Sequence, residues 1–454
     1  MTEVEHLAAF VARASYDALS EAAREQLRIR VLDSLGCALG ALDGEPIQML
    51  RMHLADFGGA EHCTLIGGGR TAPDRAAFFN GALVRYLDFN DSYLAPGETC
   101  HPSDNLGAVL AACEYANRSG RDLLTALAVA YQVQCRLSDV APVRARGFDH
   151  TTQGAYAAAA GVARALALDA ARTAHALAIS GTAFNALRVT RTGALSHWKG
   201  LAYPNTAFGA THAAFLALRG ITGPPEVFEG NKGFKEAIAG PFTIDWSRED
   251  LERVTRTILK QFNAEIHSQA TLEGIVELRA AHDLRPGAIE RVEIRTFDVA
   301  YHIIGGGEEG GKWAIRTKEE ADHSLPYMTA AAILDGAVMP EQYRPERIQA
   351  DDVQSLLRLV EVVPSADYSA RFPGEMPCRI RILYEDGRRL ETEKTDYEGF
   401  LTRPMRWETV AGKFERLAAG HADAPLRREI VDAVAHLDAI QVRDLTHLLS
   451  HVKR

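Results

Sequence analysis

Apolar residues recur at three- and four-residue spacing through the first two-thirds of the chain, the pattern of helices with one buried face. Several of these segments are rich in alanine, the strongest helix former. Residues 190–204 break the pattern and are expected to be irregular. The periodicity predicts helices over residues 3–14, 20–42, 46–57, 75–87, 106–117, 122–137, 152–167, 171–181 and 206–218.

The pattern changes near residue 265. Residues 290–296 alternate between apolar and polar, as in a half-buried strand. Residues 378–384 and 389–395 are predicted to pair as a hairpin around an Asp-Gly turn. Further helices are predicted at 270–282, 325–334 and 352–359, and the helical pattern resumes at Trp407.

This order of elements predicts a mainly α protein with two domains. We expect a large all-helical domain formed by residues 1–264 plus 405–454. Residues 265–404 are expected to form a smaller α+β domain inserted into it.

Composition narrows the class of protein. Of 454 residues, 47% are hydrophobic and 24% charged, as in an ordinary soluble protein. A net charge of −10 argues against a broad nucleic-acid or anionic-membrane surface. The six cysteines form no C-x-x-C pair, which is typical of a reducing compartment and argues against an iron–sulfur cluster. With no signal-peptide pattern and no apolar run long enough to cross a bilayer, we expect a cytoplasmic protein.

The candidate chemistry is concentrated in residues 86–107, between two predicted helices. This stretch holds Asp88, Asp91, Ser92, His101 and Ser103. Polar groups gathered within an alanine-rich helical protein indicate a functional site. Carboxylates and histidines also bind metals, but no ligand spacing of a known metal motif is present, so we expect metal-free proton transfer.

Four histidines stand at predicted helix starts, each with hydroxyl or amide neighbours: His101, His150, His267 and His323. Helix N-termini attract carboxylates and favour a neutral imidazole that can accept or donate a proton. The alternative is that the hydroxyl residues only cap helices and the histidines are incidental.

A basic segment of the chain contains Arg188, Arg191 and Lys199. These cations either face solvent or hold substrate carboxylates. No G-x-S-x-G, G-x-G-x-x-G or P-loop pattern supports a serine nucleophile, a dinucleotide or a nucleotide phosphate.

Four segments together resemble the MmgE/PrpD family: residues 86–107, 147–152, 261–269 and 321–328. The family includes 2-methylcitrate dehydratase, cis-aconitate decarboxylase and iminodisuccinate epimerase. The resemblance implies a large helical domain with a smaller α+β domain, a homodimer, and no cofactor. It also implies a pocket lined by Asp88, Ser92, His101, Lys199 and Tyr327.

The residues and the resemblance together predict a cofactor-independent lyase that dehydrates 2-methylcitrate or citrate-type tricarboxylates to the cis-alkene acid. Asp88 and His101 are the expected proton-transfer pair, His150 is a second acid–base candidate, and Lys199 and Tyr327 complete the catalytic set. Decarboxylation and epimerisation remain alternatives, as does a non-catalytic helical scaffold. The residues expected to bind substrate are Asp91, Ser92, Ser103, Arg188, Arg191, His267, Ser268, Gln269 and His323.

Overall fold

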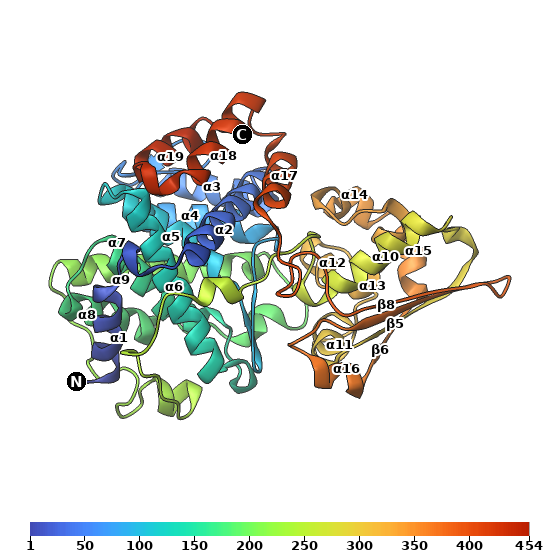
Figure 1. Cartoon of the computed structure of the whole chain (residues 1–454), viewed down its shortest axis with the longest axis horizontal. Helices are drawn as coiled ribbons and strands as arrows, with labels where there is room; N and C mark the ends of the chain where they lie inside the picture. The colour runs from blue at the N-terminus through green and yellow to red at the C-terminus, as the bar shows by residue number, and fades with distance from the viewer. Residues whose placement is uncertain (454) are drawn as a thin grey trace. The chain divides into compact units, whose positions relative to one another are not determined.

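Helices dominate the computed structural model, which describes residues 1–453 (Figure 1). The chain divides into two compact units. Unit 1 comprises Met1–Thr190, Gly200–Thr257 and the chain from Arg406 onward, and unit 2 comprises Arg191–Lys199 and Ile258–Met405. The predicted fold class is confirmed: the protein is mainly α, with a smaller α+β part.

Unit 1 is built from helices of both ends of the chain. The C-terminal helix α17 packs along α2, where Gly36 lets the two backbones approach: a Cβ there would lie 3.2 Å from the Cα of Phe414 (Figure 1). The helices are α1 (Glu3–Arg13), α2 (Glu21–Gly40), α3 (Glu45–Phe57), α4 (Pro73–Tyr86), α5 (Leu106–Tyr115), α6 (Gly120–Val140), α7 (Thr151–Ala165), α8 (Ala170–Ala183), α9 (Trp198–Leu218), α17 (Trp407–Ala418), α18 (Ala424–Ala435) and α19 (Val442–Ser450).

Helices α4 and α5 flank the polar stretch of residues 86–107. They touch through glycines: a Cβ on Gly107 would meet the backbone nitrogen of Gly81 at 2.5 Å. Between them the chain forms a hairpin of β3 (Tyr93–Ala95) and β4 (Glu98–Cys100), then a 3-10 turn over Pro102–Asn105. Gly97 turns the hairpin at φ +76°, a conformation that L side chains rarely adopt. A second short hairpin pairs β1 (Cys63–Thr64) with β2 (Arg70–Thr71).

Unit 2 contains a four-stranded sheet in the order β6-β5-β7-β8. β5 pairs with β6 in parallel and with β7 antiparallel, and β7 pairs antiparallel with β8. The strands are β5 (Ile289–Thr296), β6 (Val360–Pro364), β7 (Cys378–Tyr384) and β8 (Arg389–Lys394). The helices are α10 (Gln269–Ala281), α11 (Asp298–Ile304), α12 (Lys318–Ala321), α13 (Leu325–Asp335), α14 (Pro345–Ile348), α15 (Asp351–Leu356) and α16 (Ala366–Arg371).

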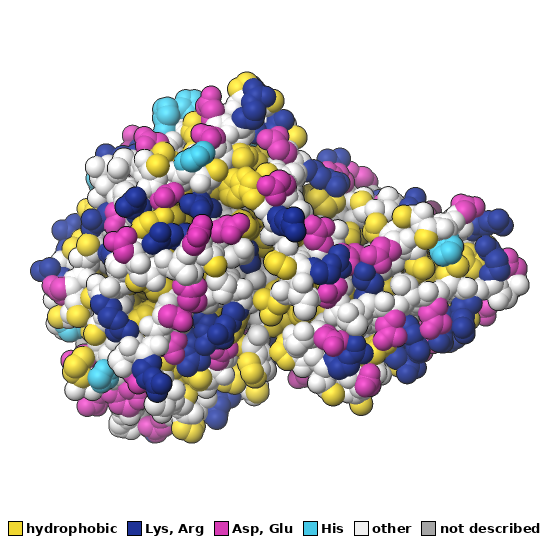
Figure 2. All heavy atoms as spheres, in the orientation of Figure 1, with side chains coloured by type: hydrophobic (Ala, Val, Ile, Leu, Met, Phe, Trp, Pro, Cys, Tyr) yellow, Lys and Arg dark blue, Asp and Glu magenta, His cyan; other side chains and the backbone are white. Residues whose placement is uncertain are grey.

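The two faces of this sheet differ as the alternation along β7 predicts. Ile380 and Ile382 are buried, whereas Arg379 and Arg381 point to the other side and pair with acids of neighbouring strands. Figure 2 shows basic and acidic side chains mixed across the face that it displays, without a broad area of one sign. On that face, therefore, charge offers no extended basic surface of the kind that nucleic acids require.

Most predicted elements are confirmed, including the strand at 290–296, the hairpin at 378–395 and the helices on either side of residues 86–107. The prediction of irregular chain over 190–204 is wrong from Trp198, where α9 begins. Pro204 lies inside that helix and packs 3.7 Å from the position of a Cβ on Gly81 of α4. Tertiary packing here outweighs the local cost of a helical proline. The sequence analysis also missed strand β6.

Among the described residues, no helix is both long and apolar enough to cross a membrane.

Candidate active site

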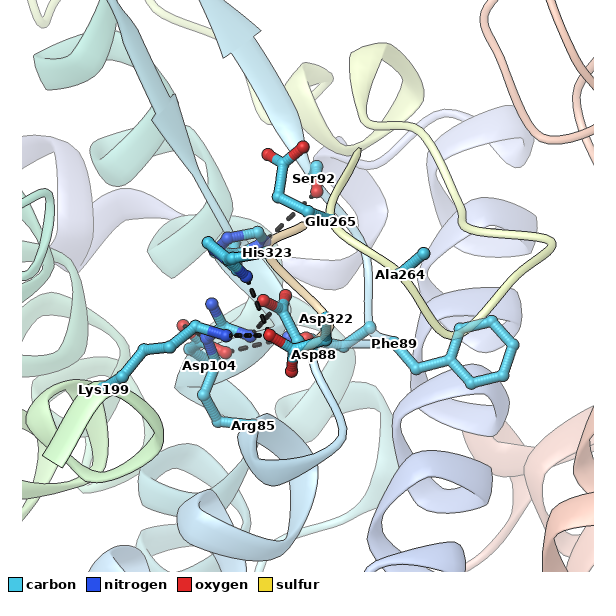
Figure 3. A network of polar contacts seen from close by, with 12 residues as sticks. Arg85, Asp88, Phe89, Ser92, Asp104, Lys199, Ala264, Glu265, Asp322 and His323 are labelled. Carbon is cyan, nitrogen blue, oxygen red and sulfur yellow. Dashed lines mark hydrogen bonds and ion pairs between the residues drawn. The ribbon is translucent and has the colours of Figure 1, made fainter. Parts of the chain in front are cut away.

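Asp88 begins the polar stretch in a left-handed backbone conformation, with φ +57° directly after α4. Its carboxylate accepts a hydrogen bond of 2.7 Å from Nη1 of Arg85, and Nε of Arg85 lies 3.6 Å from Asp104 (Figure 3). All three side chains are buried. One guanidinium thus stands between two buried carboxylates and fixes the direction in which Asp88 points.

Asp91 holds the stretch together from within. Its side chain is fully buried and accepts hydrogen bonds from the backbone and hydroxyl of Ser103, at 3.0 and 2.6 Å, and from the Tyr131 hydroxyl at 2.8 Å. Burial raises the pKa of Asp91, against the opposing effects of Arg30 and these hydrogen bonds. Asn90 adds donors to Ser103 and Asp104, both at 2.8 Å. The contacts of Asp91 and Ser103 therefore link the two ends of the polar stretch.

His101 is oriented by the same stretch. Its Nδ1 lies 2.7 Å from the carbonyl of Asp91 and 3.1 Å from the Ser92 hydroxyl. A carbonyl oxygen can only accept, so Nδ1 carries the proton and Nε2 keeps the lone pair of the neutral ring. Ser92 is thereby placed beside the imidazole that the sequence predicts to transfer protons.

His150 lies next to His101, with the ring centroids 5.4 Å apart. It occupies the N-cap position of α7 without a side-chain capping bond, and its ring stacks on Tyr203 with the centroids 6.1 Å apart. Asp149 lies 3.3 Å from its Nδ1 and 3.7 Å from Nη1 of Arg188. Unit 1 therefore brings together the predicted residues Ser92, His101 and His150. It pairs Asp88 with Arg85, and Arg188 with a carboxylate.

Unit 2 holds a second charged group, centred on Asp322. One of its oxygens lies 2.6 Å from the Lys199 ammonium and 2.8 Å from Nδ1 of His323 (Figure 3). The other oxygen lies 2.7 Å from the Lys318 ammonium. Burial alone would raise the pKa of Asp322, but Lys199 and Lys318 outweigh it and hold that pKa well below its usual range. An ionised Asp322 accepts the Nδ1 proton, which leaves the lone pair of a neutral His323 on Nε2.

His267 is oriented in the same way. Its Nδ1 lies 2.7 Å from Glu265, whose other oxygen accepts from the His267 backbone at 2.8 Å. The ring packs against Phe297 and Phe372, at 5.7 and 5.6 Å. Burial would raise the pKa of Glu265, but His267 outweighs it and lowers that pKa to about 2. The Glu265 backbone also donates to the carbonyl of Asp322 at 3.1 Å, so the two carboxylate–histidine pairs are neighbours.

The remaining predicted residues have contacts inside unit 2. Ser268 donates to the Glu265 carbonyl at 2.6 Å, and Gln269 accepts from the backbone of Gln261 and Phe262. The Tyr327 hydroxyl donates to the carbonyl of Gln342, and burial raises its pKa. Arg191 is buried in the same unit. The hydrogen bonds of Ser268, Gln269 and Tyr327 are thus made with backbone groups, which suits positioning of the chain around His267 and His323.

The sequence analysis missed Arg85, Glu265, Asp322, Lys318 and Lys312. Glu265 and Asp322 carried a signal, because each is a carboxylate one or two positions before a predicted histidine. Arg85 sits one turn before Asp88 in a predicted helix, at the spacing of an ion pair. Lys312 follows a glycine-rich run, and no sequence signal marked it, because only the fold shows that it is buried.

Comparison with known proteins agrees with these motifs. The MmgE/PrpD N-terminal domain matches residues 5–247 and the MmgE/PrpD C-terminal domain matches residues 262–439. The 2-methylcitrate dehydratase of Escherichia coli K12 is 26% identical over 415 residues, covering 84% of this chain and 83% of the relative. That of Cupriavidus necator is 29% identical over 371 residues, 76% and 73% of the two chains. The cis-aconitate decarboxylase of Mus musculus is 26% identical over 431 residues, 89% and 83%.

Proposed function

The chain belongs to the MmgE/PrpD family, and on that premise we propose that it is a lyase that dehydrates 2-methylcitrate or a similar tricarboxylate to the cis-alkene acid. The observation that carries the proposal is similarity to 2-methylcitrate dehydratases along more than four-fifths of the chain. Oriented histidines and buried lysines within the chain support it.

The reaction makes three demands on side chains. A base must remove a weakly acidic C–H proton next to a carboxylate, an acid must protonate the leaving hydroxyl, and cations must neutralise the charge that develops on the carboxylate. Nothing in these steps changes an oxidation state. Histidine suits both proton transfers because its ordinary pKa lies near neutral pH.

In unit 2, we assign proton transfer to His323 and His267 and carboxylate neutralisation to Lys199. Both imidazoles donate Nδ1–H to a buried carboxylate, so each presents the lone pair of Nε2 as a base. Lys199 is buried and fixed by Asp322 at 2.6 Å, so its charge would act at one place rather than over a mobile surface chain.

In unit 1, we assign proton transfer to His101 and hydrogen bonding of a substrate hydroxyl to Asp88 and Ser92. Arg85 donates a hydrogen bond to Asp88 and holds that carboxylate in place. The Nδ1 contacts of His101 include a carbonyl and a hydroxyl, which hold the ring in place. His150 remains the second acid–base candidate in this unit.

A cis-aconitate-type decarboxylase is the second candidate, favoured by the mouse relative, whose match covers 89% of this chain. The same side chains would serve it, because loss of carbon dioxide also leaves a carbanion that must be protonated. A non-catalytic scaffold is disfavoured by energetics. Burying Lys199 and Asp322 costs desolvation that a packed apolar core of similar volume would avoid.

The test is incubation of the whole chain with 2-methylcitrate, citrate, cis-aconitate and iminodisuccinate, followed by NMR of the products. A new vinylic signal with loss of the substrate hydroxyl is the expected result for 2-methylcitrate or citrate. Release of carbon dioxide from cis-aconitate would replace the dehydratase assignment by the decarboxylase, and stereochemical scrambling of iminodisuccinate would replace it by the epimerase. Four unchanged acids would contradict the proposal.

A further inference from the structure

Lys312 is a buried lysine in unit 2, between the glycine-rich residues 305–311 and Trp313. Its side chain is 6% exposed. Its carbonyl accepts a 2.6 Å hydrogen bond from the hydroxyl of Ser324, the residue that caps α13 and follows His323. The backbone of Lys312 is therefore tied next to the group formed by Asp322 and His323.

The ammonium of Lys312 differs from those of Lys199 and Lys318. Those two share the carboxylate of Asp322, at 2.6 and 2.7 Å. Within residues 1–453, the Lys312 ammonium makes no hydrogen bond and lies within 4.0 Å of no carboxylate oxygen. Burial of a charged ammonium costs desolvation free energy, and here no ion pair offsets that cost. Buried charges without a partner are rare unless a ligand supplies one.

Lys312 lies within electrostatic range of carboxylates of the same group. Burial lowers the pKa of Lys312, and Glu309, Glu265, Asp322 and Glu320 oppose that shift. Burial has the larger effect, so the pKa of Lys312 stays below the ordinary lysine value. A carboxylate brought into contact with this ammonium would relieve its unfavourable burial.

We propose that Lys312 is a specificity-determining residue that binds one carboxylate of a polycarboxylate substrate. The inference rests on the proposed function for the nature of the substrate. Lys199 is already assigned to a substrate carboxylate, and it is fixed by its ion pair with Asp322. Lys312 adds a second cationic point in the same unit, and two separate points select acids with at least two carboxylates over acids with one.

The experiment is calorimetric titration of the full chain with propane-1,2,3-tricarboxylate, which has no hydroxyl to lose. Lys312→Met is expected to weaken binding by roughly 10- to 100-fold, the usual effect of losing a charge-assisted hydrogen bond. Lys312→Arg should recover part of the affinity. Arg358→Met removes the same charge from an exposed position of unit 2 and should leave affinity unchanged.

Two further readouts separate ligand binding from a structural role. The substitution Lys312→Met removes a charge whose burial costs desolvation free energy. The variant should therefore melt at the same temperature as the parent or higher. Affinity of the parent should fall as pH rises through the lowered pKa of Lys312, since a neutral amine cannot pair with a carboxylate. Lys312→Met should lack that alkaline loss.

Each outcome decides a different point. Unchanged affinity of Lys312→Met, together with a lower melting temperature, would show a structural pair with Glu309 and overturn the inference. A parent chain that binds no tricarboxylate would overturn both the inference and the proposed function. A parent chain that binds it through Lys312 but converts none of the four acids would retain the inference and refute the dehydratase.

Discussion

At the scale of single residues, the clearest feature is an acid placed beside each of two histidines of unit 2, His267 and His323. Glu265 orients His267 and Asp322 orients His323, and in both pairs the carboxylate accepts a hydrogen bond from Nδ1–H. A buried carboxylate in this position fixes the tautomer and the direction of the ring. Substitution of Glu265 or Asp322 therefore tests the role of the histidine that each carboxylate orients.

Asp322→Asn is expected to lower kcat/KM by more than about 10², because it releases Lys199 and weakens the acceptor for His323. It should also destabilise the chain by about 3–5 kcal/mol, since the buried Lys199 and the partly buried Lys318 lose the carboxylate that they share. Lys318→Met is the matched comparison: it leaves the Asp322 contacts with Lys199 and His323 in place. We expect that variant to keep kcat/KM within about tenfold. Steady-state kinetics and thermal melting of both variants check this, and equal losses in the two would argue against a positioning role for Asp322.

The lowered pKa of Glu265 predicts how the stability of the folded chain depends on pH. Its pKa is lowered from 4.5 to about 2, so the folded state binds the proton less readily than the unfolded state. The resulting stabilisation is present above pH 4.5 and is lost as pH falls towards 2. A shift of this size corresponds to about 3 kcal/mol. Urea unfolding of the parent and Glu265→Gln should differ most near neutral pH and converge below pH 4.5. A difference that is constant down to pH 2 would show that the Glu265 charge contributes nothing.

At the scale of elements, the C-terminal helix α17 supports the polar stretch of unit 1. The Lys413 ammonium donates to the carbonyl of Phe89 at 2.8 Å, lies 3.6 Å from the centre of that ring, and pairs with Asp33 of α2 at 2.7 Å. Phe89 directly follows Asp88. A helix from the end of the chain thus fixes a loop near its beginning, which explains why helices from both ends share one unit.

Lys413→Met is expected to destabilise the chain by about 3–5 kcal/mol, because Asp33 is left buried without its partner. In the double variant Lys413→Met/Asp33→Asn the unpaired charge is gone, so most of that stability should return. In both the single and the double variant the Phe89 carbonyl lacks the hydrogen bond from Lys413. We therefore expect kcat to be lower than in the parent in both. Urea unfolding and kinetics of the single and double variants measure the two effects separately. Recovery of both stability and kcat in the double variant would refute the role of Lys413 in holding the loop.

The elements themselves were largely predictable, and the contacts that decide the chemistry were not. Periodicity identified the helices around residues 86–107 and the hairpin of β7 and β8, because burial of one face imposes a repeat on the sequence. It failed at Pro204, where packing against α4 overrides a local preference. The predicted histidines do lie at helix starts. Their carboxylate partners and the burial of Lys312 depend on side chains from distant segments, which no local pattern encodes.

At the scale of the whole molecule, the net charge of −10 opposes the binding of any polyanion. A stabilising effect of tricarboxylates would therefore have to come from local cations such as Lys199 and Lys312. This contrast makes unfolding of the whole chain a test of the predicted partner. A ligand that binds only the folded state adds about 2.7 kcal/mol of stability at 100 times its Kd, whatever its place of binding.

We accordingly expect propane-1,2,3-tricarboxylate to raise the melting temperature by a few degrees at saturating concentration, as a stabilisation of that size implies. The order should be tricarboxylate above dicarboxylate above acetate, since each carboxylate removed leaves one cation without a partner. Propane-1,2,3-tricarboxamide has the same shape without charge and should have no effect. Sodium chloride at matched ionic strength controls for screening, which acts on all exposed charges alike. If the chloride control raises the melting temperature as much as the tricarboxylate does, the effect is relief of the overall negative charge, and the expectation of a specific polycarboxylate ligand is refuted.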